Sequence, residues 1–141
     1  MLKYEKVLNV SASDFYNTVL LSIIAEIKQA TGKTVTIADL KNGYKYKNNI
    51  KRNGKWVEGS VNIRRPILNK EIVTTLTVLK SSYEMKYIIE KISEDSIKVT
   101  HIQTSPVSDG FINSLLFKNR TNKRFKDIEK YIKQTGKKET E

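Results

Sequence analysis

The chain has 141 residues, near the commonest size for one domain, so we expect a single hydrophobic core. It contains no cysteine, which excludes disulfides, thiolate metal sites and a cysteine nucleophile. Its formal net charge is +11, with only 2 Pro and 6 Gly, a composition typical of a folded chain with a polar, anion-attracting surface.

The N-terminal part predicts a strand followed by a helix. Apolar and polar side chains alternate over residues 2–10, as in a half-buried strand. Ser11 or Ser13 can cap a helix over roughly residues 13–31, which has one apolar stripe and should end at Gly32. With no signal peptide and no apolar segment long enough to span a bilayer, the sequence leads us to expect a cytoplasmic protein.

From Gly43 onward, short alternating segments are joined by turn signals. Residues 36–40 offer one possible helical turn before this region. Asn53-Gly54 predicts a tight hairpin, Pro66 and Asn69 bracket a second turn, and residues 80–82 and 93–96 predict two more. The pattern indicates an antiparallel meander with strands over residues 44–51, 56–64, 72–79, 83–90 and 97–101.

The C-terminal part predicts a long amphipathic helix. A loop over residues 104–108 contains Pro106, and Ser108 or Asp109 can cap a helix that continues to about residue 135. Gly136 should end this helix and leave residues 137–141 as a frayed tail. We therefore predict one domain over residues 1–136.

This order of elements resembles the helix-grip fold of the START and Bet v 1-like (SRPBCC) superfamily. The resemblance is carried by the strand that enters the Ser-Ala-Ser-Asp-Phe cap at residues 11–15, by the Asn53-Gly54 hairpin and by the closing helix at 109–135. It implies an α+β fold in which a curved antiparallel sheet of about six strands wraps a long C-terminal helix. One or two short helices would follow the first strand, and a cavity often lies between sheet and helix.

The chain also resembles a small, uncharacterised family of such domains from low-GC Gram-positive bacteria. The stretch LKNGYKY at residues 40–46 and the stretch KRFK at residues 123–126 carry this second likeness. Neither resemblance identifies a ligand, because one fold supports many functions.

The inner face of the expected sheet and the closing helix supply candidates for a ligand cavity. A lining that is mostly apolar, with a few hydroxyls and one imidazole, suits a small hydrophobic or amphipathic molecule such as a lipid. The alternative is that these side chains simply fill a close-packed core. The candidates are Tyr44, Tyr46, Met85, Tyr87, Val99, His101, Phe111 and Leu115.

His101 is the only histidine, and such a side chain can act as an acid or a base near neutral pH. The sequence offers it no partner: there is no nucleophile elbow, carboxylate pair, glycine-rich phosphate loop or metal-ligand cluster. We therefore predict no catalytic residue, no cofactor and no metal, and keep an enzymatic function as the remotest of three hypotheses.

Basic residues in two segments, 41–70 and 118–138, offer a surface for an anionic partner. Aromatic side chains among them would suit single-stranded nucleic acid, but alternation places Tyr44 and Tyr46 on the face opposite Lys45 and Lys47. The alternative is a merely solvated surface. The candidates are Lys45, Lys47, Arg52, Lys55, Arg120, Lys123, Arg124 and Lys126.

The leading hypothesis is therefore noncatalytic binding of a small hydrophobic or amphipathic ligand between sheet and helix. The alternative hypothesis is an interaction module whose basic surface binds an acidic protein or a nucleic acid.

Overall fold

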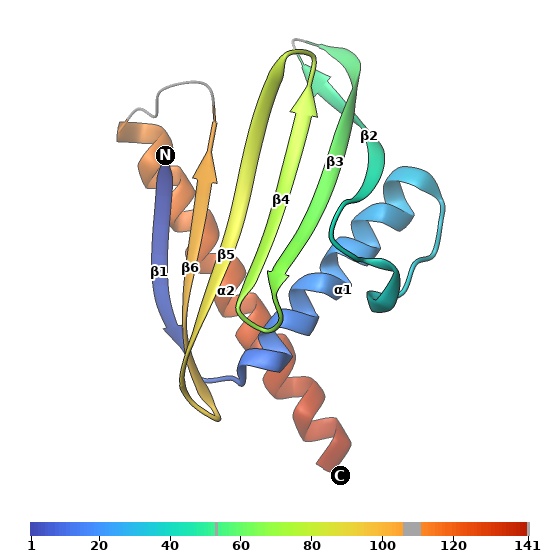
Figure 1. The fold of residues 1–141 in the computed structure, drawn as a ribbon. Helices are drawn as coiled ribbons and strands as arrows, with labels where there is room; N and C mark the ends of the chain where they lie inside the picture. The colour runs from blue at the N-terminus through green and yellow to red at the C-terminus, as the bar shows by residue number, and fades with distance from the viewer. Residues whose placement is uncertain (53, 106–110, 141) are drawn as a thin grey trace.

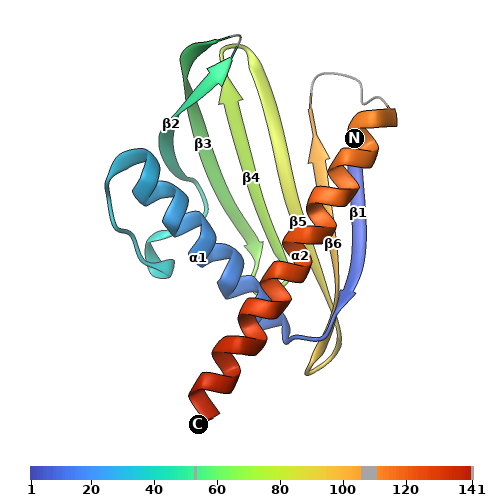
Figure 2. The ribbon, with the colours of Figure 1, turned by 180° about the vertical axis from the view of Figure 1, so that it is seen from behind.

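The computed structural model describes the backbone of residues 1–52, 54–105 and 111–140 (Figure 1). Six strands form one antiparallel sheet in the order β1-β6-β5-β4-β3-β2, and both long helices lie on its concave face (Figure 2). The predicted helix-grip α+β fold is thereby confirmed. The elements are β1 (Leu2–Leu8), α1 (Ala12–Thr31), the short 3-10 helix η1 (Ile37–Asp39), β2 (Tyr44–Arg52), β3 (Lys55–Ile67), β4 (Glu71–Val78), β5 (Ser81–Ser93), β6 (Ser96–Thr104) and α2 (Phe111–Thr140).

Local signals set the ends of α1. The Ser11 hydroxyl accepts a hydrogen bond from the backbone N–H of Asp14 at 3.1 Å and satisfies one of the free N–H groups of the first turn. Gly32 takes a left-handed conformation with φ of 78°, and its N–H donates to the Lys28 carbonyl at 2.8 Å. Both ends are therefore as predicted, and η1 forms the helical turn expected over residues 36–40.

The turns of the meander differ from the prediction in two places. Pro66 lies inside β3, where the register shifts between Arg64 and Ile67, and the turn follows at Asn69, whose φ is 60°. A bulge tolerates proline because one ladder hydrogen bond is already missing there. The turn between β4 and β5 is formed by Leu79 and Lys80 rather than by residues 80–82.

The predicted hairpin joins β2 and β3, with Arg52 opposite Lys55 and a positive φ at Gly54. Asn53, Pro106, Ser108 and Asp109, on which we based a turn, a loop and a helix cap, lie outside the described residues.

The closing helix is longer than predicted, because α2 continues through Gly136 to Thr140. A glycine inside a helix costs only about 1 kcal/mol relative to alanine, and no proline follows to stop the helix. The prediction that Gly136 ends the helix was therefore wrong.

The core is centred on Phe125 of α2, which is fully buried. Its ring lies 5.9 Å from Tyr4 of β1, 5.9 Å from Phe15 of α1 and 6.3 Å from Tyr87 of β5, measured between ring centroids. Polar contacts hold the same helix along β1: the Tyr4 hydroxyl donates to Asn122 Oδ1 at 2.9 Å, and the Asn9 N–H donates to Glu129 Oε2 at 2.8 Å. These contacts set the line along which α2 crosses the sheet.

Leu79 allows a test of backbone strain. Its φ of 56° is unfavourable for a residue with a Cβ atom, by about 1 to 2 kcal/mol, and its side chain is exposed. We expect Leu79→Gly to unfold with a free energy about 1 kcal/mol higher than Leu79→Ala, measured by urea denaturation. Both variants remove the leucine side chain, so only the conformational strain differs. Equal stabilities would show that the turn is unstrained.

Candidate functional site

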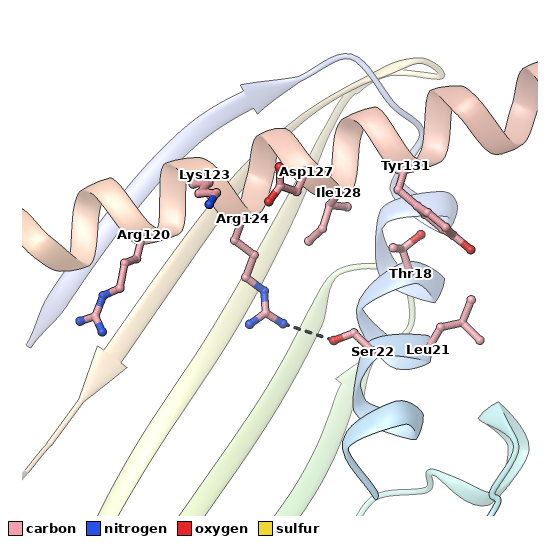
Figure 3. A pocket seen from close by; sticks show the side chains of 9 residues that line it. All are labelled: Thr18, Leu21, Ser22, Arg120, Lys123, Arg124, Asp127, Ile128 and Tyr131. Carbon is pink, nitrogen blue, oxygen red and sulfur yellow. Dashed lines mark hydrogen bonds between the residues drawn. The ribbon is translucent and has the colours of Figure 1, made fainter. Parts of the chain in front are cut away.

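Helices α1 and α2 cross near the N-terminal half of α1 and then diverge over the concave face of the sheet (Figure 2). A cavity of about 510 Å³, largely open to solvent, lies between them; it is lined from α1 by Thr18, Leu21 and Ser22 and from α2 by six side chains, all labelled in Figure 3. A second cavity of about 300 Å³ lies between α2 and strands β5 and β6. The two cavities share Arg120 and Arg124, so these arginines stand at their common boundary.

Arg124 connects the two helices across the larger cavity. Its Nη2 donates a hydrogen bond to Ser22 Oγ of α1 at 3.3 Å (Figure 3). Its guanidinium carbon also lies 5.8 Å from the ring centroid of Tyr87, within cation–π range. Arg124 therefore contacts α1, α2 and the sheet at once while remaining exposed to solvent.

The phenol groups of Tyr46 and Tyr87 on the concave face are uncharged. Burial raises the pKa of Tyr46 to about 12, with a further contribution from the negative charge of Glu26 on α1. Burial also raises the pKa of Tyr87, although Arg124 opposes the shift. The pKa of Glu26 is itself raised by desolvation of its carboxyl and lowered in part by Arg124, although the residue as a whole is exposed.

His101 of β6 is held between two aromatic rings. Its ring centroid lies 4.4 Å from Tyr87 at an interplanar angle of 23°, and 5.4 Å from Phe117 of α2 at 19°. Nδ1 lies 3.2 Å from the Lys86 carbonyl, so it carries the proton and donates to that oxygen. Burial lowers the pKa of His101 to about 4, so the imidazole is neutral at pH 7 and its Nε2 is a hydrogen-bond acceptor.

Most of the predicted cavity residues lie on the concave face, but few of them line a cavity. Tyr46, Tyr87 and Val99 are buried within the core cluster, and Tyr44 packs partly buried against it. Met85 and His101 line the smaller cavity. These positions leave the proposed binding role of the six sheet residues as a prediction.

The prediction that Leu115 faces the cavity was wrong. Its side chain is 51% exposed and lines neither cavity. Phe117 takes this role, because residues two apart on a helix point about 200° away from each other around the axis. The spacing of four between Phe117, Thr121 and Phe125 would have indicated the buried stripe. The side chain of Phe111 lies outside the described part of the structure.

The basic candidates fall into two separate groups. Lys45 and Lys47 are exposed on the convex side of the edge strand β2, opposite the buried Tyr46, and Lys47 pairs with Glu58 at 3.1 Å. The second group lies on α2, over the concave side, where Arg120, Lys123 and Arg124 line the larger cavity. Lys55 and Lys126 are exposed outside both cavities, and the side chain of Arg52 is not described.

Comparisons with known proteins support the fold and a family assignment. A family model described as "Domain of unknown function (DUF3284)" matches residues 2–115. A search of curated proteins found no sequence match. None of the helices in the described residues has a stretch long and apolar enough to cross a membrane.

Several solved structures share the architecture along nearly the whole chain. Ara h 8.0201 is 13% identical with a TM-score of 0.58, covering 94% of this chain and 97% of that one. A START superfamily protein from Mycobacterium smegmatis is 17% identical with a TM-score of 0.54, covering 95% and 97%. The di-domain ARO/CYC StfQ from the steffimycin biosynthetic pathway is 11% identical with a TM-score of 0.53, covering 92% and 43%. At these identities the likeness establishes the helix-grip fold.

The buried histidine predicts an acid-sensitive stability. The folded protein takes up the His101 proton only near pH 4, whereas the unfolded chain takes it up near pH 6.5. As pH falls through this window, protonation favours the unfolded state, and His101 alone should lower the free energy of unfolding by up to about 3 kcal/mol. His101→Phe keeps an aromatic ring in the stack and should lose this component of the pH dependence in denaturant melts. An NMR titration midpoint for His101 near 6.5 would contradict the burial effect.

Proposed function

Because the chain belongs to the DUF3284 family, whose description defines no activity, we propose a function from its own geometry: it binds a small amphipathic molecule that carries an anionic group. The observation that carries the proposal is the position of Arg120 and Arg124 at the boundary between the larger cavity, whose lining is mostly apolar, and the smaller cavity, whose lining is more polar. The anionic group lies at these arginines, and the apolar body occupies the larger cavity.

The arginines are available for an anion. Among the described residues, neither guanidinium has a carboxylate within ion-pair distance, and the polar partner of Arg124 is the neutral Ser22 hydroxyl. Arg120, Lys123 and Arg124 outnumber the acid in the same lining, Asp127, so a bound carboxylate, sulfonate or phosphate meets a net positive wall. Arginine also suits this task because its planar fork can hold two oxygens of such a group at once.

The surfaces beside the arginines suit an apolar body. Leu21, Ile128 and the ring of Tyr131 line the larger cavity, and Met85 and Phe117 line the smaller one. A volume of about 510 Å³ falls in the range of ordinary small-molecule pockets. Burial of apolar ligand surface then supplies most of the affinity, and the arginines supply orientation.

The polar group of His101 supports binding rather than proton transfer. The imidazole is neutral at pH 7 with Nδ1 committed to the Lys86 carbonyl, so it offers a ligand hydroxyl an acceptor at Nε2. We therefore propose noncatalytic binding, with His101 as a positioning contact in the smaller cavity.

A matched pair of fluorescent probes tests the proposal. Anilinonaphthalene sulfonate has an aromatic body with an anionic group, and phenylnaphthylamine has the same body without it. We expect the sulfonate to bind more tightly, and Arg124→Ala to weaken its binding about tenfold while leaving the neutral probe unaffected, because one charge-assisted hydrogen bond is worth about 1.5 kcal/mol. Fluorescence titration at fixed ionic strength measures both affinities.

The control variants separate a site from general charge attraction. Lys126→Ala removes an exposed cation from the same helix outside both cavities and should leave both affinities unchanged. Ser22→Ala keeps the Arg124 charge and frees its guanidinium, so sulfonate binding should persist. Equal losses from Arg124→Ala and Lys126→Ala would reject the cavity site in favour of a diffuse basic surface. Equal affinity of both probes for the unaltered protein would reject the anionic requirement.

A further inference from the structure

We propose that the end of the sheet formed by the β2–β3 and β4–β5 hairpins docks onto the surface of an anionic lipid bilayer. Both hairpins lie at the same end of the molecule, the upper end in Figure 1. This proposal concerns a different surface from the cavities and holds whether or not they bind a ligand.

Two large apolar side chains are exposed at this hairpin end. Trp56 is 70% exposed near the start of β3, and Leu79 is 73% exposed in the turn after β4. The register places Gly59 of β3 beside Val78, the residue before Leu79. Trp56 therefore lies within roughly 10 Å of Leu79 along the strand direction. Indole rings favour the polar–apolar boundary of a bilayer, and a leucine beside one adds apolar surface to insert.

The backbone of Leu79 supports a role for its side chain. Its φ of 56° is a conformation that glycine or asparagine adopts more easily. A strained residue whose side chain is mostly exposed contributes little to the packing of the core, and such strain recurs at functional positions. A leucine here presents apolar surface to solvent that glycine would lack.

The charge at the hairpin end complements anionic headgroups. Four exposed lysines lie in the two hairpins, and the carboxylate of Glu58 in β3 is already paired with Lys47 at 3.1 Å. Each lysine close to an anionic membrane surface strengthens attachment. The four are Lys47, Lys51, Lys55 and Lys80.

The opposite end of the sheet also exposes apolar side chains, but its charges do not suit an anionic bilayer. Leu68, in the turn between β3 and β4, is 69% exposed, much like Leu79. The neighbouring β5–β6 turn carries the exposed acids Glu94 and Asp95, which repel anionic headgroups. Apolar side chains coincide with an excess of lysines at the hairpin end, where Glu58 pairs with Lys47 and leaves Lys51, Lys55 and Lys80 as the excess. The leucine there favours a bilayer over a nucleic acid, which would use stacking rings instead.

The experiment uses the protein's own fluorescence, because Trp56 is its only tryptophan. We expect vesicles of phosphatidylcholine with phosphatidylserine to shift Trp56 emission to shorter wavelength and to shield it from acrylamide. Pure phosphatidylcholine should give a weaker response, and added salt should reduce binding by screening the lysines.

Two variants and their matched controls assign the response to the hairpin end. Leu79→Ser should lower the partition coefficient about tenfold, and Lys80→Glu by roughly thirtyfold. Leu68→Ser and Lys70→Glu make the same changes at the opposite end of the sheet and should leave the partition coefficient unchanged. An unshifted Trp56 spectrum with anionic vesicles, or equal losses in the controls, would overturn the proposal. Quenching of Trp56 by a single-stranded oligonucleotide without a vesicle response would also overturn it and assign this surface to nucleic acid.

Discussion

The packing of Phe125 determines how the rest of the molecule is arranged. Its buried ring meets Tyr4, Phe15 and Tyr87, which come from β1, α1 and β5, so one side chain joins both helices to the sheet. The hydrogen bonds that the Tyr4 hydroxyl donates to Asn122 and the Asn9 N–H donates to Glu129 then fix one side of α2 to β1 and the residue that follows it. The remaining side of α2, which carries Arg120 and Arg124, is left facing the space beside α1.

This arrangement separates charge from aromatic surface within the candidate site. The rings of Tyr87, His101 and Phe117 stack beneath the helix and are neutral, because burial opposes both ionised tyrosine and protonated histidine. The guanidinium of Arg124 lies above them, held by a single hydroxyl of α1. Neutral aromatic rings below a long cationic side chain suit a molecule that is apolar apart from one anionic end.

The sequence was most informative where a local rule decides the structure. Alternation placed Tyr46, Tyr87 and His101 on the inner face, and Ser11 and Gly32 marked the ends of α1. It was misleading at the start of α2, where apolar residues occur all around the helix and several of them could face the sheet. Leu115 was therefore selected, and Phe117 was not. The position of Arg120 and Arg124 at a cavity depends on where α1 crosses α2. Arg124 and Ser22, which meet at this crossing, are 102 residues apart in the sequence, so no local pattern could indicate their contact.

The position of β2 at one edge of the open sheet has a consequence for self-association. An edge strand offers unpaired backbone N–H and C=O groups, which can hydrogen-bond to a strand from a second molecule and begin aggregation. Lys45, Lys47 and Lys51 alternate along this edge and are all exposed. Two such edges brought together would place like charges within one screening length of each other. The lysines of β2 therefore act as gatekeepers against intermolecular sheet growth, a protection that weakens as ionic strength rises.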